Sequence, residues 1–348
     1  MTMMQIFPLW LISLIIRSFL FSLVERIKHR IAHENEGNRT YFEEANACMK
    51  EDLTAMKKMI AIDLDGTLLN TKSEISAQNW EALIRAKEAG YIVTICTGRA
   101  TFDVKELLGD LDIPIIAANG GTVHTEGYKL FSRITLDQEA GKQAARALVE
   151  RNIYFEVYTD DALLSPFDGK EKLKAEFDVI KSANPNEDIA DLWEGAMTQF
   201  KQFGIKPVDD IRQIFESNEA TYKLLCFSFD MNKLQEARNL LAEMPELSLT
   251  SSGKHIIEVL PKESGKGHAL KKLAAHYGVD RSHIYAIGDS PNDLSMFEEA
   301  GHRIAMGNAV DVIKEKSTYM TKGNHEDGVA YFIDLLLQNQ FHEKKTLV

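Results

Sequence analysis

The sequence predicts an α/β protein in which a doubly wound parallel sheet is interrupted by an α+β insertion. Three observations lead to this prediction. Short apolar runs alternate with helical segments from residue 59 onward, and each run ends at polar residues. The alternation is lost between about 136 and 252, where helical stretches dominate. It returns after 252, and a chain of 348 residues is long enough for about two domains.

The elements follow one another regularly in the first part of this region. An apolar run at 59–62 ends at an aspartate, and the next segment reads as a helix with Ser76 as its N-cap and Gly90 just beyond its end. "YIVTIC" (91–96) is rich in β-branched residues and predicts a buried strand, as does "IPIIAA" (113–118) after a second helix. In such sheets the loops after the strands hold the ligand.

The insertion has a different pattern. We expect helices at 137–151 and over much of 170–217, with strand-like runs at "IYFEVY", "TYKLLCFSF" and "LSLTSS". The parallel-sheet pattern then resumes with "HIIEVL" (255–260), a helix at 265–277, "HIYAIG" (283–288), "HRIAM" and a helix at 327–338. The expected domains are a segment 1–55, a core made of 56–135 and 253–340, and an inserted cap at 136–252.

Composition limits the classes of partner. The formal net charge is -12, with 52 acidic and 40 basic residues, which argues against nucleic acid because a phosphate backbone needs a basic surface. Cys48, Cys96 and Cys226 are too few and too widely spaced for a disulfide framework or a cysteine-rich metal site. We therefore expect a cytoplasmic protein.

The first segment allows two interpretations. "IFPLWLISLIIRSFLFSLV" (6–24) is about long enough to span a bilayer, and the basic residues after it would keep the rest of the chain in the cytoplasm. Arg17 near its centre would cost about 2.5–3.5 kcal/mol on insertion scales. The other interpretation is that translation begins at Met56 or Met59. Membrane contact is expected only if 6–24 is an anchor.

The first chemical motif is "DLDGT", directly after the first predicted strand. In an extended segment, positions i and i+2 project from the same side, so Asp63 and Asp65 can face one ligand. Two close carboxylates ionise together only if a cation shares their charge or one of them keeps a proton. One would then be a nucleophile or metal ligand and the other a general acid and base. The alternative is simple turn chemistry, because Asp-Gly is common in turns.

Two further motifs point to an anion. Thr97, Gly98 and Arg99 follow the second predicted strand, where a hydroxyl, a backbone amide and a helix N-terminus make an anion-binding corner. Taken alone, the motif is better explained as a helix N-cap. Lys266 lies between two glycines and could reach a phosphate, although by itself it reads as an exposed surface lysine. The surrounding residues do not match a phosphate-binding P-loop.

The fourth motif is "GDSPND" after another predicted strand. Asp289, Asn292 and Asp293 supply hard oxygen ligands of the kind that Mg²⁺ prefers. A turn followed by a helix cap would explain the same residues without a metal.

The order of the four motifs resembles that of the haloacid dehalogenase (HAD) superfamily of phosphohydrolases over about 58–340, and "IAIDLDGTLL", "ANGG" and "NHEDGVA" look like its Cof-type branch. The resemblance implies a Rossmann-like core with an α/β cap inserted between the second and third motifs. It also implies an Mg²⁺-dependent phosphatase of sugar phosphates or other small phosphorylated metabolites. Mg²⁺, Lys266 and backbone amides would offset the repulsion between an attacking carboxylate and a phosphate.

Residue roles follow from the resemblance. Asp63 would be the nucleophile that forms an aspartyl-phosphate, and Asp65 would protonate the leaving oxygen and later activate water. Metal contacts would come from Asp63, the Asp65 backbone carbonyl, Asp289, Asn292 and Asp293. Phosphate and substrate contacts would come from Leu64, Thr97, Gly98, Arg99, Asn119, Gly120, Lys266 and Asn292. Weaker candidates are Glu258, His325, Glu326 and Asp327, whereas Cys96 reads as a buried strand residue.

Two alternatives stay open at this stage. A phosphomutase or phosphotransferase of the same superfamily would use the same aspartyl-phosphate. A membrane-tethered protein that binds a phosphometabolite without catalysis is a second alternative, although binding alone has no need of Asp65. The sequence names neither the substrate nor the oligomeric state, because no motif in 136–252 can be read chemically.

Overall fold

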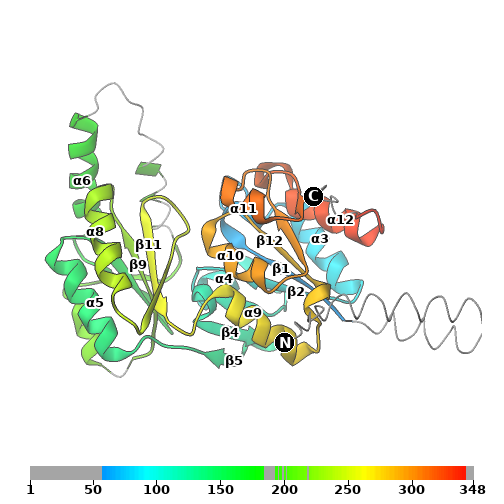
Figure 1. The fold of residues 1–348 in the computed structure, drawn as a ribbon, viewed down its shortest axis with the longest axis horizontal. Coiled ribbons are helices and arrows are strands. Elements are labelled where there is room, and N and C mark those ends of the chain that lie inside the picture. Colours follow the sequence, from blue (N-terminus) through cyan, green and yellow to red (C-terminus); the bar gives the residue numbers. More distant parts are fainter. Residues whose placement is uncertain are drawn as a thin grey trace, which may run out of the picture. The chain divides into compact units, whose positions relative to one another are not determined.

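The computed structural model describes residues 57–183, 193–194, 196–197, 200, 202–217 and 219–341 (Figure 1). The described part of the chain contains two β-sheets, one of eight strands and one of six. The larger sheet has the strand order β14-β13-β12-β1-β2-β3-β4-β5, and the smaller has the order β10-β11-β9-β6-β7-β8. From Lys57 onward, the described residues form one compact unit.

Six parallel strands make up most of the larger sheet. They are β1 (Lys58–Ile62), β2 (Tyr91–Cys96), β3 (Ile115–Ala117), β12 (Ile284–Gly288), β13 (His302–Ala305) and β14 (Tyr319–Met320). Met59, Ile60, Ala61 and Ile62 are fully buried, because β1 lies between β2 and β12 and helices cover both faces. A continuous apolar run is typical of such a strand.

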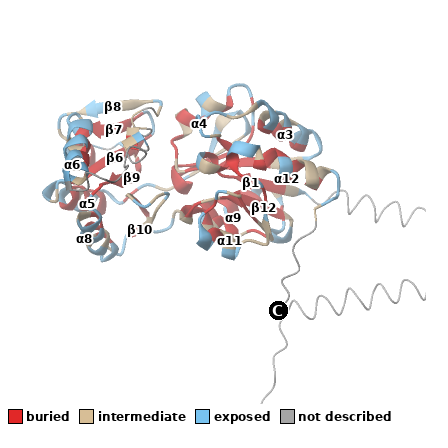
Figure 2. Ribbon diagram, turned by 90° about the horizontal axis from the view of Figure 1, so that it is seen from above, coloured by how far each residue is buried: buried red, intermediate tan, exposed pale blue. Residues whose placement is uncertain are grey.

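Helices flank this sheet. They are α3 (Ala77–Glu88), α4 (Thr101–Leu108), α9 (Lys266–Tyr277), α10 (Leu294–Glu298), α11 (Asp311–Lys316) and α12 (Gly328–Leu337). Figure 2 shows α3 and α12 on one side of β1 and α9 and α11 on the other. Helix α3 begins where expected, because the side chain of Ser76 accepts a hydrogen bond from the backbone N–H of Asn79. The doubly wound arrangement predicted from the sequence is confirmed.

The smaller sheet has its own core. Its strands are β6 (Tyr154–Thr159), β7 (Leu163–Pro166), β8 (Ile205–Val208), β9 (Thr221–Phe227), β10 (Leu247–Thr250) and β11 (Ile256–Pro261). Helices α5 (Gln138–Glu150) and α8 (Met231–Ala242) cover one face, and α6 (Gly169–Ala183) also belongs to this part (Figure 1). Apolar side chains such as Phe155, Leu224 and Ile257 fill the space beneath α5 and α8.

Two expectations from the sequence are wrong. Residues 255–260 do not return to the parallel sheet, because β11 pairs antiparallel with β9 and β10 in the smaller sheet. The helix expected within 170–217 is present as α6, and β8 at Ile205–Val208 interrupts the helical stretch. The larger sheet is not purely parallel, because β4 (Thr122–Thr125) and β5 (Lys129–Arg133) extend it as antiparallel strands. An apolar run shows that a strand is buried but does not name its neighbours.

The division into core and cap stays a proposal. We place the second boundary after Pro261, because β11 belongs to the smaller sheet. The 6–24 segment, with its two interpretations, lies outside the described residues. Among the helices that are described, none combines the length and the apolar character that a membrane span requires.

Candidate active site

Three parallel strands deliver polar residues to one edge of the larger sheet. Asp63 follows β1, Thr97 follows β2 and Asp289 follows β12. The three strands are neighbours in the order β12-β1-β2, so their carboxyl ends lie side by side. The backbone N–H of Asp63 donates to the carbonyl of Ile287 across 3.1 Å, which fixes the end of β1 against β12. This is the edge at which α/β sheets bind ligands.

A tight turn after Asp63 brings the chain past Asp289. Gly66 has a φ of +78°, a conformation that L side chains rarely adopt. A Cβ at this position would lie 2.4 Å from Oδ2 of Asp289, so the turn also needs the space that glycine leaves. Oγ1 of Thr67 donates to Oδ1 of Asp289 across 3.0 Å. The turn therefore orients the Asp289 carboxylate.

Lys266 lies in the middle of the acidic residues. Its Nζ donates to Oδ1 of Asp63 across 2.6 Å and to Oδ1 of Asp293 across 2.7 Å. The side chain is fully buried, so the interpretation as an exposed surface lysine is wrong. Burial opposes its charge, but the two carboxylates outweigh burial and raise the pKa of Lys266. A protonated lysine therefore faces the oxygen atoms of Asp63.

Asp63, Asp289 and Asp293 form a compact acidic cluster. One carboxylate oxygen from each lies within 4.8 Å of the others. Burial and the charge of Asp293 raise the pKa of Asp63 and raise that of Asp289 to about 7. Lys266 neutralises one of the three charges, so a divalent cation would relieve the remaining repulsion. The cluster consists of carboxylate oxygens, so the contacts expected from the Asp65 backbone carbonyl and the Asn292 amide stay predictions.

The oxygens of Asp293 are already occupied by protein donors. Oδ1 accepts from Lys266, and Oδ2 accepts from the backbone N–H groups of Asp289 and Ser290. Asp63 and Asp289 are therefore better suited to bind an ion directly, and Asp293 is better suited to hold Lys266 and the loop in place. The donor set of oxygen atoms fits a hard cation.

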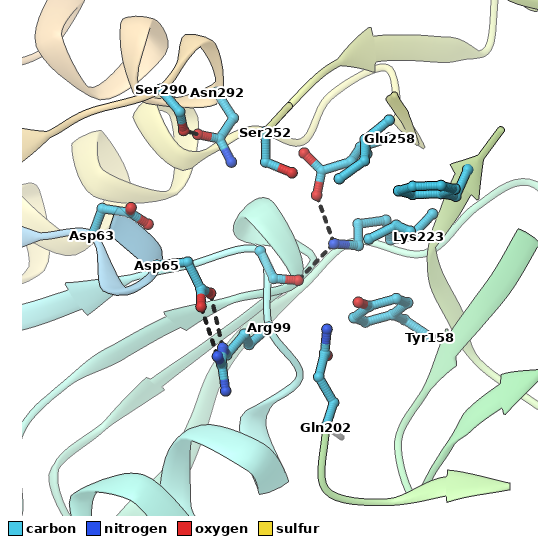
Figure 3. A pocket seen from close by; sticks show the side chains of 14 residues that line it. Asp63, Asp65, Arg99, Tyr158, Gln202, Lys223, Ser252, Glu258, Ser290 and Asn292 are labelled. Atoms are coloured by element: carbon cyan, nitrogen blue, oxygen red, sulfur yellow. Dashed lines mark hydrogen bonds and ion pairs between the residues drawn. The ribbon is translucent and has the colours of Figure 1, made fainter. Parts of the chain in front are cut away.

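Asp65 is turned toward Arg99. Nε and Nη2 of Arg99 donate to Oδ2 and Oδ1 of Asp65 across 2.8 and 2.6 Å. Arg99 also donates to Asp103 across 3.0 Å. Asp63 and Asp65 line the same cavity, and Figure 3 shows the Asp65 carboxylate directed at Arg99 rather than at Asp63. The bidentate pair fixes Asp65 at the edge of the site.

The anion-binding corner is built differently from a helix cap. Helix α4 begins at Thr101 with Ala100 as its N-cap, so the N-cap interpretation of Thr97 is wrong. Oγ1 of Thr97 accepts from the backbone N–H of Arg99 across 3.1 Å and is fully buried. The backbone N–H of Asn119 donates to the carbonyl of Thr97, which joins the ends of β2 and β3.

Asn119 and Gly120 lie beside this corner. Both have positive φ angles, +52° and +89°. The side chain of Asn119 is buried, and neither Nδ2 nor Oδ1 has a hydrogen-bond partner among the described residues. The side chain of Asn119 packs closely against Gly98, because a Cβ added to that glycine would lie only 3.3 Å from Oδ1 of Asn119. The two residues are therefore near the site, as the sequence suggested.

A cavity of about 200 Å³ opens from Asp63 toward the smaller sheet (Figure 3). The lining on the core side is Asp63, Asp65, Gly98, Arg99, Ser290 and Asn292, and that from the insertion includes Tyr158, Lys223, Ser252 and Glu258. The sequence reading missed Tyr158, Lys223 and Ser252. The runs "TYKLLCF" and "IIEVLP" each contain one charged residue, Lys223 and Glu258, and a single charge within a buried strand could have marked these two positions as functional.

The remaining candidates lie elsewhere. The Leu64 side chain is buried in the apolar core, so only its backbone can face a ligand. His325 is exposed and lies 3.8 Å from Glu326, while Asp327 accepts a hydrogen bond from Ser76 across 2.6 Å. The cavity is not lined by His325, Glu326 or Asp327. Cys96 is buried at the end of β2 with a raised pKa caused by burial, as expected of a structural thiol.

Comparison with known proteins decides the family. The sequence model of the haloacid dehalogenase-like hydrolases matches residues 60–333. The chain belongs to this family. It is 68% identical over 284 residues to the 5-amino-6-(5-phospho-D-ribitylamino)uracil phosphatase YwtE of Bacillus subtilis (strain 168), covering 82% of this chain and 99% of that protein. It is 38% identical to the phosphatase YwpJ of the same organism, covering 80% and 100%.

Solved structures agree with this assignment. A haloacid dehalogenase-like hydrolase from B. subtilis superimposes with a TM-score of 0.72 at 37% identity, covering 80% of this chain and 99% of that one. The sugar phosphatase BT4131 of subclass IIB, at 20% identity and a TM-score of 0.64, shares the fold. This haloacid dehalogenase-like hydrolase is therefore an enzyme of the phosphatase type, a phosphoric monoester hydrolase. Hydrolases of the family use a metal ion, and the acidic cluster supplies suitable ligands.

Proposed function

We propose that this hydrolase is an Mg²⁺-dependent phosphatase in which Asp63 attacks the phosphorus atom of a small phosphorylated metabolite. The observation that carries the proposal is the position of the Asp63 carboxylate. It is buried at the end of β1, 2.6 Å from Lys266 and within the cluster of three aspartates. A carboxylate held beside a cation and a metal site can approach an anionic phosphate.

The chain's own residues divide the reaction into two steps. Oδ of Asp63 forms a bond to phosphorus while the bond from phosphorus to the leaving oxygen breaks, and Asp65 gives its proton to that oxygen. Asp65 then takes a proton from water, which attacks the aspartyl-phosphate and releases inorganic phosphate and free Asp63. Because Arg99 binds Asp65 in a bidentate pair, Asp65 must turn away from Arg99 before it can reach the leaving oxygen.

The other site residues hold the reactants. Lys266 and Thr97 would bind the phosphoryl oxygens, and the backbone of Leu64, Gly98 and the loop at Asn292 would border them. Asp63, the backbone carbonyl of Asp65 and Asp289 would hold Mg²⁺. When bound, the ion reduces the repulsion between carboxylate and phosphate.

We further propose the substrate 5-amino-6-(5-phospho-D-ribitylamino)uracil. Relatives named as phosphatases of this compound are 68%, 31% and 28% identical to this chain. A relative named as a pyridoxal phosphate phosphatase, from Escherichia coli (strain K12), is 28% identical. The cavity beyond Asp63 offers side chains for a polar leaving group. We expect the enzyme in the cytoplasm, where its buried free thiols at Cys96 and Cys226 stay reduced.

Phosphate release tests the proposal. The purified chain is incubated with p-nitrophenyl phosphate or the ribitylaminouracil phosphate, with Mg²⁺ or with EDTA. We expect turnover that requires Mg²⁺ and falls by about 10³-fold or more in Asp63→Asn. Exposed Asp178→Asn on α6 is the matched control and should retain wild-type turnover. Turnover that is insensitive to EDTA, or undiminished in Asp63→Asn, would contradict the mechanism. Equal kcat/KM for pyridoxal phosphate would contradict the substrate.

A further inference from the structure

The face of the smaller sheet opposite α5 and α8 carries charged residues where it borders the cavity, while α6 packs on another part of this face. Register pairs Tyr158 with Lys223 and Leu225 with Glu258, and alternation places all four side chains on the same face. The opposite face is apolar and packs on α5 and α8. Lys223 and Glu258 are 1% exposed each. Charged residues are rarely buried so completely in a sheet unless each charge is satisfied.

The contacts of Lys223 come from two parts of the chain. Its Nζ donates to Oε1 of Glu258 across 2.8 Å and to the backbone carbonyl of Gly98 across 2.6 Å. It also lies over the Tyr158 ring, 4.1 Å from the centroid. Two acceptors and an aromatic ring therefore already surround the ammonium group. Lys223 ties the insertion to the loop after β2 and holds Glu258.

Glu258 is only half satisfied. Oε1 accepts from Lys223, but Oε2 is buried and has no hydrogen-bond partner among the described residues. Glu258 lines the cavity, and Figure 3 shows its carboxylate directed into the space between Ser252 and Lys223. A buried carboxylate oxygen without a donor is costly, and a ligand that supplied an N–H or O–H would remove this cost.

The charges around the cavity exclude one kind of ligand. Among the described residues that line it, the cations are Arg99 and Lys223. Lys223 is paired with Glu258, and Arg99 stays paired with Asp103 when Asp65 turns toward the leaving oxygen. A second anionic group placed beside Glu258 would therefore meet its carboxylate while the adjacent cation, Lys223, is already paired.

We propose that Glu258 determines the specificity of this phosphatase. Its free carboxylate oxygen accepts a hydrogen bond from a hydroxyl or N–H of the leaving group, and Lys223 fixes its position. The enzyme thereby selects neutral leaving groups that carry donors, and it rejects those with a second anionic group. This inference rests on the proposed function, since it concerns the leaving group of the same site.

Three substrates separate the effect of hydrogen-bond donors on the leaving group from the effect of a second anionic group. D-ribitol 5-phosphate carries hydroxyl donors, and p-nitrophenyl phosphate carries none on its leaving group. In 5-phospho-D-ribonate a carboxylate stands in place of the terminal hydroxymethyl group of ribitol. In Glu258→Gln the amide keeps an acceptor for Lys223 but loses the carboxylate. We expect the ratio of kcat/KM for D-ribitol 5-phosphate to that for p-nitrophenyl phosphate to fall about tenfold or more, which is the loss of one hydrogen bond to a charged group. Discrimination against 5-phospho-D-ribonate should weaken.

The design keeps the two proposals distinguishable. Ratios measured in one preparation do not depend on the folded fraction, and Glu258→Asp, which retracts the carboxylate, should lower the first ratio as well. Glu236→Gln, on the exposed side of α8, is the matched control and should leave both ratios unchanged. Unchanged ratios in both Glu258 variants of an active enzyme would overturn the role of Glu258 alone. No Mg²⁺-dependent release from any probe by the wild type would overturn the proposed function, and this inference with it.

Discussion

Replacing Glu156 with glutamine should change how the stability of the protein depends on pH. Glu156 lies on β6 and is fully buried. Oε1 accepts a hydrogen bond from the Tyr154 hydroxyl across 2.7 Å, and Oε2 has no hydrogen-bond partner among the described residues. Burial raises the pKa of Glu156 from 4.5 to about 7, although the Tyr154 hydroxyl and the charge of Lys223 act in the opposite direction.

The sign follows from this raised pKa. Between pH 4.5 and about 7 the unfolded chain has lost the proton of Glu156 while the folded protein keeps it. The contribution of Glu156 to the free energy of unfolding is therefore fully present below pH 4.5 and is lost as the pH rises through 7. At 1.36 kcal/mol per pH unit, the difference between the two pKa values corresponds to about 3 kcal/mol lost at pH 8. Glutamine does not ionise, so Glu156→Gln should be as stable as wild type near pH 4.5 and more stable by about that amount at pH 8.

Denaturation by urea at several pH values between 4.5 and 8.5, followed by circular dichroism, measures the effect. Comparing the variant with wild type at each pH cancels the titration of all other groups. Glu236, which is exposed on α8, offers a matched control, and Glu236→Gln should stay close to wild type in stability at every pH. A difference between wild type and Glu156→Gln that stays constant over this pH range would refute the argument.

Three further substitutions test the geometry of the site. Gly66→Ala would place a Cβ 2.4 Å from Oδ2 of Asp289 and displace this carboxylate. The Mg²⁺ concentration that gives half-maximal turnover should therefore rise, and an unchanged concentration would count against the role of this turn. Lys266→Met removes the cation beside Asp63, so the single-turnover rate of phosphate release should fall by about 10²–10³-fold. An unchanged rate would argue against the role of this lysine. Gly267→Ala would bring a Cβ to 2.0 Å from the backbone carbonyl oxygen of Ser295 in α10, so the melting temperature should fall by several degrees. An unchanged melting temperature would disprove this close packing.

The sequence was most informative where a single local pattern decides the outcome. Ser76 caps its helix as predicted, because a serine before an apolar repeat satisfies free N–H groups at a helix start. The run before Asp63 is a fully buried strand, as continuous apolar residues predict for a strand covered on both faces. The motifs after the strands could be placed at one edge of the sheet, because the carboxyl ends of parallel strands meet there.

The sequence was less informative where partners far apart in the chain decide the outcome. The run at 255–260 has the same apolar character as the core strands, yet β11 pairs with β9, because pairing depends on which strands reach it in space. Lys266 read as a surface residue because its partners, Asp63 and Asp293, lie 203 and 27 positions away. The sequence indicated a general acid and base at Asp65, and only the folded structure shows that this carboxylate is paired with Arg99.

By itself the sequence determined the fold class, the strand that ends at Asp63 and the kinds of side chain available for chemistry. Periodicity, caps and turns are local, and they act through the nearest residues along the chain. The tertiary structure decided which charges face one another: Lys266 between two carboxylates, Asp65 against Arg99, and Lys223 against Glu258. Electrostatic energies depend on distance and burial, which sequence spacing does not specify, so these pairings required the folded chain.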